Sequence, residues 1–161
     1  MLSGRGFTFF ELLVVMALIT VVSAIAVPVL MEGTTRNQVW TASEMIGAQI
    51  RQARLKAISR NMSFRVRFNC PAAGQLRVLR VTGDGTIDNA DDRCDDTLEY
   101  DSGIYQMPGN VSYGDSPPTL TVNSRGVFTS TGSIPAVLTV SSGTSSRSMH
   151  VSGTGQIAFY E

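Results

Sequence analysis

The feature that most constrains this chain is a run of twenty residues without a formal charge, from Leu12 to Met31. As an α-helix this run is about 30 Å long, which matches the hydrocarbon thickness of a bilayer. Arg5 is the only charged residue before Glu11, so the positive-inside rule places the short N-terminus in the cytoplasm. We therefore expect one membrane-spanning helix, with the later residues outside the cytoplasm.

Glu11 separates three interpretations of this segment. A cleaved signal peptide fits the basic start, the apolar stretch and the small-residue pattern Ala24-Ile25-Ala26, and would leave Val27 as the first residue. An uncleaved membrane anchor fits the apolar stretch equally well. Neither gains from a carboxylate beside the apolar run, which costs roughly 2.5–3.5 kcal/mol at a bilayer centre and less near the interface. A carboxylate in this position indicates a function that needs a cationic partner.

The residues around Glu11, Gly6-Phe7-Thr8-Phe9-Phe10-Glu11-Leu12, resemble the type IV prepilin peptidase site. In type IV pilin-like proteins the leader is cut after the glycine, the new N-terminus is N-methylated, and the glutamate meets the N-terminal amine of a neighbouring subunit. The resemblance implies cleavage after Gly6, an N-methylated Phe7, and Glu11 as the assembly carboxylate. The new amine is the cation that a carboxylate in a filament core requires.

Helical periodicity continues beyond the apolar run. Pro28, together with Gly33 and its β-branched neighbours, predicts a kink or a locally unwound turn over residues 28–35. Trp40 and Met45 lie outside the apolar stripe that follows, and we interpret them as subunit contacts. The stripe itself has a spacing of three and four residues and predicts packing against a sheet. Its members are Val39, Ala42, Ile46, Ile50, Ala53 and Ala57.

The pattern changes from helix to strand after Asn61, a predicted helix end. Apolar residues alternate with Arg65 and Arg67 over residues 64–68, which predicts a half-buried strand with a basic outer face. Clusters of Gly, Pro, Ser and Asp separate further short strands, as in antiparallel sheets. Those strands are expected at 76–81, 98–105, 111–113, 120–122, 127–128, 137–140, 149–151 and 157–160.

Two later regions are similar to the GspH/FimT (FimU-like) group of pseudopilins and minor pilins. They are the helix end, over 41–46 and 52–61, and the C-terminal strands, over 120–126 and 147–155. The resemblance implies an α+β, pilin-like fold in which a long N-terminal helix, transmembrane and then filament core, packs on an antiparallel β-sheet head. The expected parts are a leader (1–6), the transmembrane and filament-core half of the helix (7–31), its amphipathic outer half (32–61) and the β-rich head (62–161).

Charges in the head are segregated, although the formal net charge is zero. Eight of the thirteen basic residues lie within 51–80, and eight of the thirteen acidic residues lie within 84–101. Adjacent blocks of opposite sign pair within a fold or across subunit contacts more often than they bind outside ligands. Cys70 and Cys94 are the only cysteines, and an exported head predicts one disulfide between them.

The acidic block resembles the second half of an EF-hand-like loop. Asp84, Asp88 and Asp91 are its candidate calcium ligands, but Arg80 stands where the first oxygen ligand belongs. An arginine does not ligate a cation, so a solvated acidic loop is favoured over a calcium-binding adhesin. We expect no metal and no cofactor.

The chain lacks the residue spacings typical of enzymes, such as a nucleophile elbow or a phosphate loop. His150 has no acidic or cysteine neighbour in sequence, and we interpret it as a structural or surface residue.

Some FimT-like minor pilins take up DNA through a C-terminal Gly-Arg-x-Arg motif. This chain has Gly155-Gln156-Ile157-Ala158 there, and without the arginines DNA binding is expected to be weak.

These features predict a structural subunit rather than an enzyme. The favoured function is a minor pilin of a type IV pilus, assembled into or priming the filament after prepilin peptidase cleavage and N-methylation. Its expected partners are other pilins, the peptidase and the inner membrane, which a single helix crosses with the head in the periplasm. The alternatives are an H-type minor pseudopilin of a type II secretion system and a DNA-uptake minor pilin. The cysteine pair and the acidic loop favour the pilus.

Overall fold

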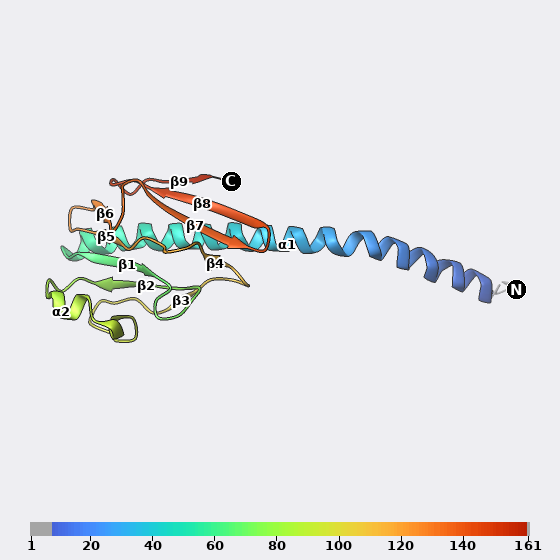
Figure 1. Cartoon of the computed structure of the whole chain (residues 1–161), viewed down its shortest axis with the longest axis horizontal. Helices are drawn as coiled ribbons and strands as arrows, with labels where there is room; N and C mark the ends of the chain where they lie inside the picture. The colour runs from blue at the N-terminus through green and yellow to red at the C-terminus, as the bar shows by residue number, and fades with distance from the viewer. Residues whose placement is uncertain (1–7, 161) are drawn as a thin grey trace, which may run out of the picture. The chain divides into compact units, whose positions relative to one another are not determined.

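The computed structural model describes residues 8–160, except for the side chain of Val29. These residues fall into two units that divide between Thr35 and Arg36. One helix, α1 (Phe9–Arg60), contributes its N-terminal part to the first unit and its C-terminal part to the second (Figure 1). The second unit also contains all of the strands, which form the head.

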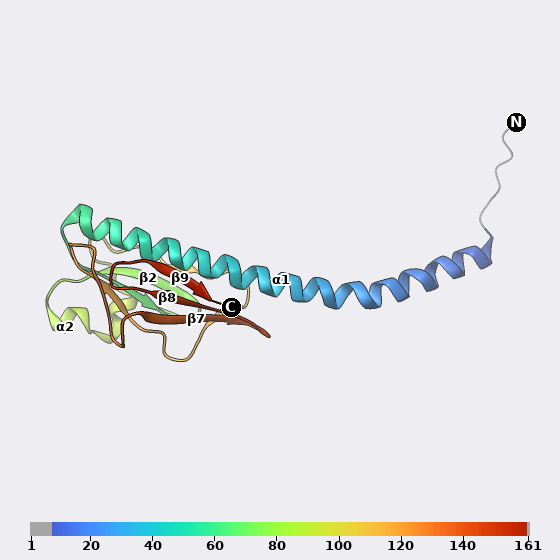
Figure 2. The same ribbon diagram turned by 90° about the horizontal axis from the view of Figure 1, so that it is seen from above.

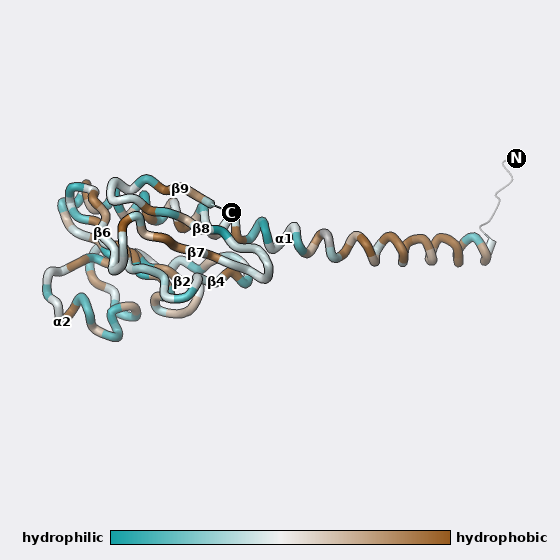
Figure 3. The backbone as a smooth tube through the Cα atoms, turned by 45° about the horizontal axis from the view of Figure 1, so that its top comes forward, coloured by the Kyte–Doolittle hydropathy of each residue, from teal (hydrophilic) through white to brown (hydrophobic). Residues whose placement is uncertain are grey.

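The first unit is an apolar helix without internal cover. Its large side chains are exposed, with 61% of Leu18 and 67% of Leu30 accessible to solvent. Figure 3 shows this part of α1 as an almost continuous hydrophobic segment. Within residues 8–160, α1 is the one helix that is long and apolar enough to cross a membrane. A long apolar helix is thus confirmed, and its crossing of a membrane stays a prediction. Its exposed apolar surface is of the kind that lipid or other apolar helices cover.

Of the kink or locally unwound turn predicted over residues 28–35, the unwound turn is absent, because α1 continues through Pro28. Proline removes one helical N–H, and that loss is local. The hydroxyl groups of Thr34 and Thr35 donate to the carbonyl oxygens of Met31 and Glu32, at 2.7 and 2.9 Å. The hydroxyl groups of these β-branched residues therefore bond back to the helix backbone. Their helix propensity is only slightly lower than that of better helix formers, and this difference does not end the helix.

The second part of α1 packs on the head through the predicted stripe. All six stripe residues, from Val39 to Ala57, are at most 1% exposed. The helix ends as predicted, since Asn61 has a φ of 51°. The N–H of Met62 donates to the Ala57 carbonyl and the N–H of Asn61 to the Ile58 carbonyl, a Schellman end in which the last carbonyls are satisfied. Met45 is half-buried and packs against the core, and its interpretation as a subunit contact stays a prediction.

The described strands of the head form two antiparallel sheets (Figures 1 and 2). The first has the order β3-β2-β1-β5-β6 and the second the order β4-β7-β8-β9. The strands are β1 (Phe64–Phe68), β2 (Gln75–Arg80), β3 (Tyr105–Gln106), β4 (Ser112–Tyr113), β5 (Leu120–Val122), β6 (Phe128–Ser130), β7 (Ala136–Ser142), β8 (Ser145–Val151) and β9 (Ile157–Tyr160).

Alternation along the strands separates the core from the surface. In β1, Phe64, Val66 and Phe68 are buried, and Arg65 and Arg67 lie on the other face. The inward residues of β7 and β8 join the same hydrophobic core as the stripe of α1. A single core therefore fixes the C-terminal part of the helix and both sheets together.

The strand predicted over residues 98–105 was wrong, since only Tyr105 belongs to a strand. The preceding acidic block contains a short helix α2 (Gly85–Asp88) and a 3-10 turn η1 (Asp91–Cys94). Beside β2, side chains take part of the backbone ladder, while the Ser102 N–H still donates to the Val78 carbonyl at 2.8 Å. The Arg80 N–H donates to the Asp101 carboxylate at 2.6 Å, and the Val78 N–H donates to the Ser102 hydroxyl at 2.8 Å.

Substitution of a stripe residue tests this packing. Ile50→Ala should lower the free energy of unfolding of the head by about 2–5 kcal/mol, because Ile50 is fully buried and truncation leaves a cavity. Leu55→Ala is the matched control, since Leu55 lies on the same helix and is 68% exposed. Urea unfolding of the detergent-solubilised chain, followed by circular dichroism, measures both. Equal effects of the two changes would contradict the assigned core.

Candidate functional site

The first candidate site is the N-terminal turn of α1. The hydroxyl of Thr8 accepts a hydrogen bond from the N–H of Glu11 at 3.2 Å. This is half of a capping box, in which Thr precedes the helix and Glu lies three residues later. The Glu11 side chain is exposed and lies at the positive end of the helix dipole, which favours a carboxylate. Gly6 and Phe7 lie outside the described residues.

The second candidate site is residues 82–102 of the head, which we call the acidic loop. Cys94 of this loop is joined by a disulfide to Cys70, which follows β1, and the two Cα atoms are 5.2 Å apart. The pairing predicted from the sequence is thus confirmed. The disulfide fixes the middle of the loop to the first sheet.

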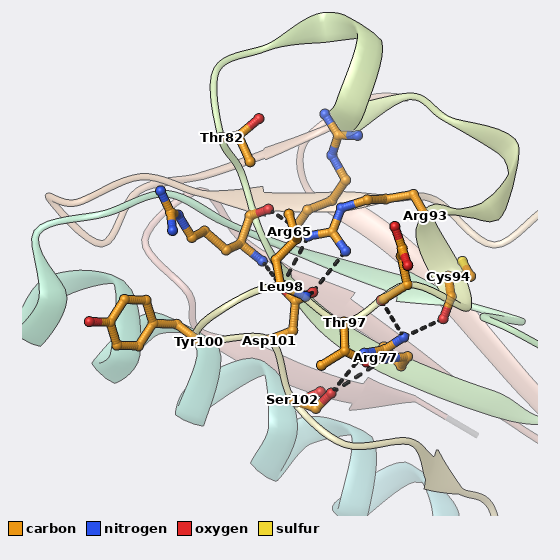
Figure 4. A network of polar contacts seen from close by, with 12 residues as sticks. Arg65, Arg77, Thr82, Arg93, Cys94, Thr97, Leu98, Tyr100, Asp101 and Ser102 are labelled. Atoms are coloured by element: carbon orange, nitrogen blue, oxygen red, sulfur yellow. Dashed lines mark hydrogen bonds and ion pairs between the residues drawn. The ribbon is translucent and has the colours of Figure 1, made fainter.

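A buried ion pair holds the C-terminal part of the acidic loop (Figure 4). Nη1 of Arg93 lies 2.7 Å from Oδ2 of Asp101, and Nη2 lies 3.0 Å from Oδ1. Both side chains are almost inaccessible, at 3% and 0%. Two N–H groups, of Arg80 and Leu98, also donate to the carboxylate. Asp101 is therefore bidentate to a guanidinium and saturated with donors, the geometry that lets a buried pair offset its desolvation.

The charge state of Asp101 follows from these contacts. Burial raises the pKa of its carboxyl, but the hydrogen bonds from Arg93, Arg80 and Leu98 outweigh burial and hold the pKa below its usual value. The pKa of Arg93 is raised, chiefly by its hydrogen bonds to Asp101. The pair is therefore ionised at neutral pH.

A second guanidinium, that of Arg77, binds loop carbonyls rather than an acid. Arg77 lies on β2 and is 2% exposed. It donates to the carbonyl oxygens of Cys94, Asp96 (2.9 Å) and Ser102 (3.3 Å), and to the hydroxyl of Thr97 at 3.1 Å. These carbonyls lack partners within regular structure, so the buried arginine takes the place of a strand or helix for this part of the loop.

Two of the three predicted calcium candidates have local roles, and the third, Asp91, is exposed in the first turn of η1. Asp84 caps α2, with its carboxylate accepting from the Thr86 N–H at 2.8 Å. The carboxylate of Asp88 accepts hydrogen bonds from Thr82 and Gly83. Burial raises the pKa of Asp88, but these bonds outweigh it and lower the pKa. Within residues 8–160, no three His, Cys, Asp or Glu side chains are placed to hold a metal ion.

The basic side chains of the loop region point inward and several carboxylates point outward. Arg77 and Arg93 are buried, so their guanidinium groups bind the loop and do not contribute positive charge to the surface. The exposed acidic side chains are Asp84, Asp91, Asp92, Asp95, Asp96 and Glu99. The surface of the acidic loop is consequently negative, although the sequence around it contains many arginines.

The basic face of β1 is partly occupied. The guanidinium of Arg65 donates to the Asp88 carbonyl at 2.8 Å and approaches the Asn89 side chain at 3.4 Å. The ring of His150 lies 4.5 Å from that of Tyr160, centroid to centroid. The guanidinium of Arg65 is thus bound to the acidic loop, and the His150 ring packs against Tyr160.

Arg147, a buried arginine that was not predicted from the sequence, joins α1 to the second sheet. Arg147 on β8 stacks between Trp40 (3.7 Å) and Phe159 (4.3 Å), and donates to the Ser43 hydroxyl at 2.7 Å. Cation–π contacts of this kind are strongest when desolvated. The signal was present in the strand pattern, since Arg147 shares its parity with the inward residues Met149 and Val151.

Comparison with known proteins identifies relatives at the level of family and fold. The family model described as "Type II transport protein GspH" matches residues 42–156, more than half of the chain. The model of the "Prokaryotic N-terminal methylation motif" matches residues 1–27. No curated protein matches the chain.

The fold is similar to solved structures of low sequence identity. Two crystal forms of the type IV minor pilin FimU of Pseudomonas aeruginosa give TM-scores of 0.54 and 0.51, with 16% and 12% identity. They cover 80% and 76% of this chain and 92% of FimU. The minor pseudopilin EpsH from the Type 2 Secretion System of Vibrio cholerae gives a TM-score of 0.49 and 14% identity over 76% of this chain and 96% of EpsH. The likeness to FimU shows a shared fold.

The ion pair of Arg93 and Asp101 predicts acid sensitivity of the head. The folded-state pKa of Asp101 is lowered, so its contribution to stability is complete above the unfolded value of about 3.9 and is lost as pH falls through the folded value. We expect the free energy of unfolding to decline from about pH 5 downward. Urea titrations of the detergent-solubilised chain between neutral and acid pH measure this decline.

Asp101→Asn identifies the source of this acid sensitivity. At neutral pH it should cost about 3–5 kcal/mol, because Arg93 is left buried without its counter-charge, and it should flatten the acid decline. The exposed Asp95→Asn is the control and should stay within about 0.5 kcal/mol of the original chain. An unchanged acid decline in the Asp101 variant would show that other carboxylates govern it.

Proposed function

Because this chain belongs to the GspH family and carries the N-terminal methylation motif, we propose that it is a minor pilin of a type IV pilus. In this role it is a structural subunit and not an enzyme. The proposal is carried by one observation, an uncovered apolar helix with a carboxylate in its first turn. Such a helix needs a bilayer first and other apolar helices afterwards.

The parts of the chain then have successive roles. Residues 1–6 are a leader that a prepilin peptidase removes after Gly6, and Phe7 becomes the N-methylated terminus. Residues 7–31 cross the inner membrane and later enter the filament core, and residues 32–61 carry the head, residues 62–161, on the periplasmic side. Thr8 supports this division, because it caps α1 immediately after the proposed new terminus.

Glu11 sets which subunits join and in what register. Moving an apolar helix from lipid into a bundle of apolar helices changes its hydrophobic burial little, since lipid tails are as apolar as leucine. A charge pair in the same surroundings distinguishes strongly between subunit arrangements that pair the charges and those that do not, because an unpaired charge there is costly. The α-amine of a neighbouring subunit is the cation that fits Glu11, and the pair forms at one axial position only.

The pseudopilus of a type II secretion system is the alternative, and the name of the matching family, "Type II transport protein GspH", favours it. We place the chain in a pilus because its head holds an exposed, disulfide-fixed acidic loop. DNA uptake receives less support. Arg65 is already bonded to the loop, and the segment from Gly155 to Ala158 contains no arginine.

Processing of the terminus is the first test of the proposal. Chain extracted from the membrane should begin at N-methyl-Phe7, as shown by mass spectrometry of the N-terminal peptide. In a strain without prepilin peptidase the same peptide should retain Met1–Gly6. A chain that begins at Val27 would instead establish a cleaved signal peptide and remove the filament role.

Substitution of Glu11 tests the charge pair. Glu11→Gln should leave membrane insertion and the disulfide-bonded head intact, while incorporation into filaments falls by about tenfold or more, because the incoming amine is left without a counter-charge. Glu11→Asp should rescue only part of the incorporation, since its carboxylate is one methylene shorter. The measurement is the amount of chain in sheared filaments relative to the membrane.

Glu32→Gln is the matched control for Glu11, because Glu32 is an exposed carboxylate of the same helix. It should be incorporated as the original chain is. Normal incorporation of the Glu11→Gln variant would contradict the proposed role of this carboxylate.

A further inference from the structure

The second sheet of the head ends in an open edge at β9. Its strand order places β9 last, after β8, and no ribbon lies beyond β9 in the view of Figure 1. The other described edges are shorter, with two residues each in β3 and β4 and three in β6. Short edges are one way in which proteins prevent strand pairing with other chains. β9 has four residues and is the longest edge strand among residues 8–160.

The sequence of β9 lacks the usual protection of an edge strand. Its residues, Ile-Ala-Phe-Tyr, include no charge and no proline, the features that commonly block edge pairing. Aromatic and β-branched residues instead favour strand pairing. Tyr160 is 53% exposed. An edge of this composition is a template for another strand.

The backbone register identifies which groups of β9 are free. The N–H of Ser152 donates to the carbonyl of Gln156 at 2.9 Å in the β8–β9 turn. Hydrogen-bonded and non-bonded positions alternate in an antiparallel pair. Gln156, Ala158 and Tyr160 therefore direct their backbone groups toward β8. The N–H and C=O groups of Ile157 and Phe159 point to the open edge.

A groove of about 590 Å³ runs beside this edge. It is lined by Arg51 of α1 and by residues that include His150, Gln156, Ala158 and Tyr160. Arg51 is exposed, and among the described residues it makes no hydrogen bond or ion pair. It is the one charged residue in the lining. The groove thus combines free backbone groups, an aromatic wall and a single guanidinium.

We propose that the β9 edge binds an extended segment of a neighbouring filament subunit, by strand addition, with an acidic side chain of that segment paired to Arg51. The inference rests on the proposed function, because it requires a filament neighbour. Backbone groups of Ile157 and Phe159 supply the strand bonds, as in other β-augmentation contacts. Arg51 selects the acid, since a guanidinium matches a carboxylate in geometry and charge.

A nucleic acid fits this groove less well than an acidic peptide segment. Each bound phosphate requires a cation, and affinity for DNA rises with the number of Lys and Arg contacts. The groove has Arg51 alone. One cation beside an unpaired strand edge matches one carboxylate on an extended chain.

Photo-cross-linking in intact filaments tests the proposal with the full chain. Benzoylphenylalanine is placed at Ala158, which lines the groove, or at Ser146, an exposed control residue on β8 of the same sheet. We expect the probe at 158 to form an adduct with a pilin subunit. Mass spectrometry should locate the cross-link in an extended segment that contains Asp or Glu. The probe at 146 should give no adduct of that kind.

Charge variants then test the role of Arg51. Arg51→Glu should reduce the adduct by about tenfold, and Arg51→Lys should retain most of it. Arg125→Glu is the control, because Arg125 is also exposed and its side chain makes no hydrogen bond or ion pair with any residue of the described chain.

The outcomes separate the two proposals. Chain that enters filaments without an adduct from 158, or with equal adducts from 158 and 146, contradicts the strand-addition site alone. An adduct with nucleic acid contradicts it as well. Absence of the chain from filaments, with intact head and membrane insertion, contradicts both the site and the proposed function.

Discussion

The structure depends on one constraint, which is that the apolar part of α1 has no cover within its own unit. Burial of a large apolar side chain contributes about 1.5–3 kcal/mol, which is lost when the side chain stays in water. The exposed apolar side chains of this part extend from Phe9 to Met31. No adjustment of the head removes this cost, because the two parts of the chain are separate units. In the proposed function, a bilayer and then the apolar helices of other subunits supply this cover. Glu11 is the one charged group from Phe9 to Met31. In apolar surroundings it strongly favours a partner that supplies a positive charge over one that does not.

In the head, a long irregular segment is held against the first sheet. Residues 82–102 contain little regular structure, so their carbonyl and N–H groups need other partners. Two buried guanidiniums and two buried carboxylates supply them. Arg77 binds carbonyls, and Asp88 accepts from the N–H groups of Thr82 and Gly83. Arg93 and Asp101 bind each other and the backbone of β2. The disulfide adds a covalent link at Cys94. The same arrangement leaves the remaining carboxylates on the surface, where they give the acidic loop its negative face.

Sequence periodicity predicted most of the fold because burial sets a repeat in helices and strands. The stripe from Val39 to Ala57 and the alternation in β1 follow directly from that repeat. The segment before β3 was mispredicted as a strand, because side chains of Asp101 and Ser102 take part of the ladder beside β2, and no local pattern encodes a contact made with a distant strand. The segregated charges indicated pairing of the two blocks within the fold or across subunits, but Asp101 pairs with Arg93 of its own segment, and Arg65 and Arg77 of the basic block bind loop carbonyl oxygens. Arg147 was missed for a related reason, since its aromatic partners come from α1 and β9. Glu11 was singled out because a carboxylate beside an apolar run has few explanations, and its role in assembly stays a prediction.

The central claim is that this chain is a subunit of a surface filament. The most direct test is quantitative mass spectrometry of peptides from the original head in sheared and purified pili, with pseudopili of the same host prepared in parallel. The account predicts that the chain is present in pili at a small fraction of the major subunit, and that it disappears from them when prepilin peptidase is inactivated. Recovery from pseudopili alone would move the chain to the secretion system. Recovery only from the inner membrane, in cells that assemble both filaments, would contradict the claim.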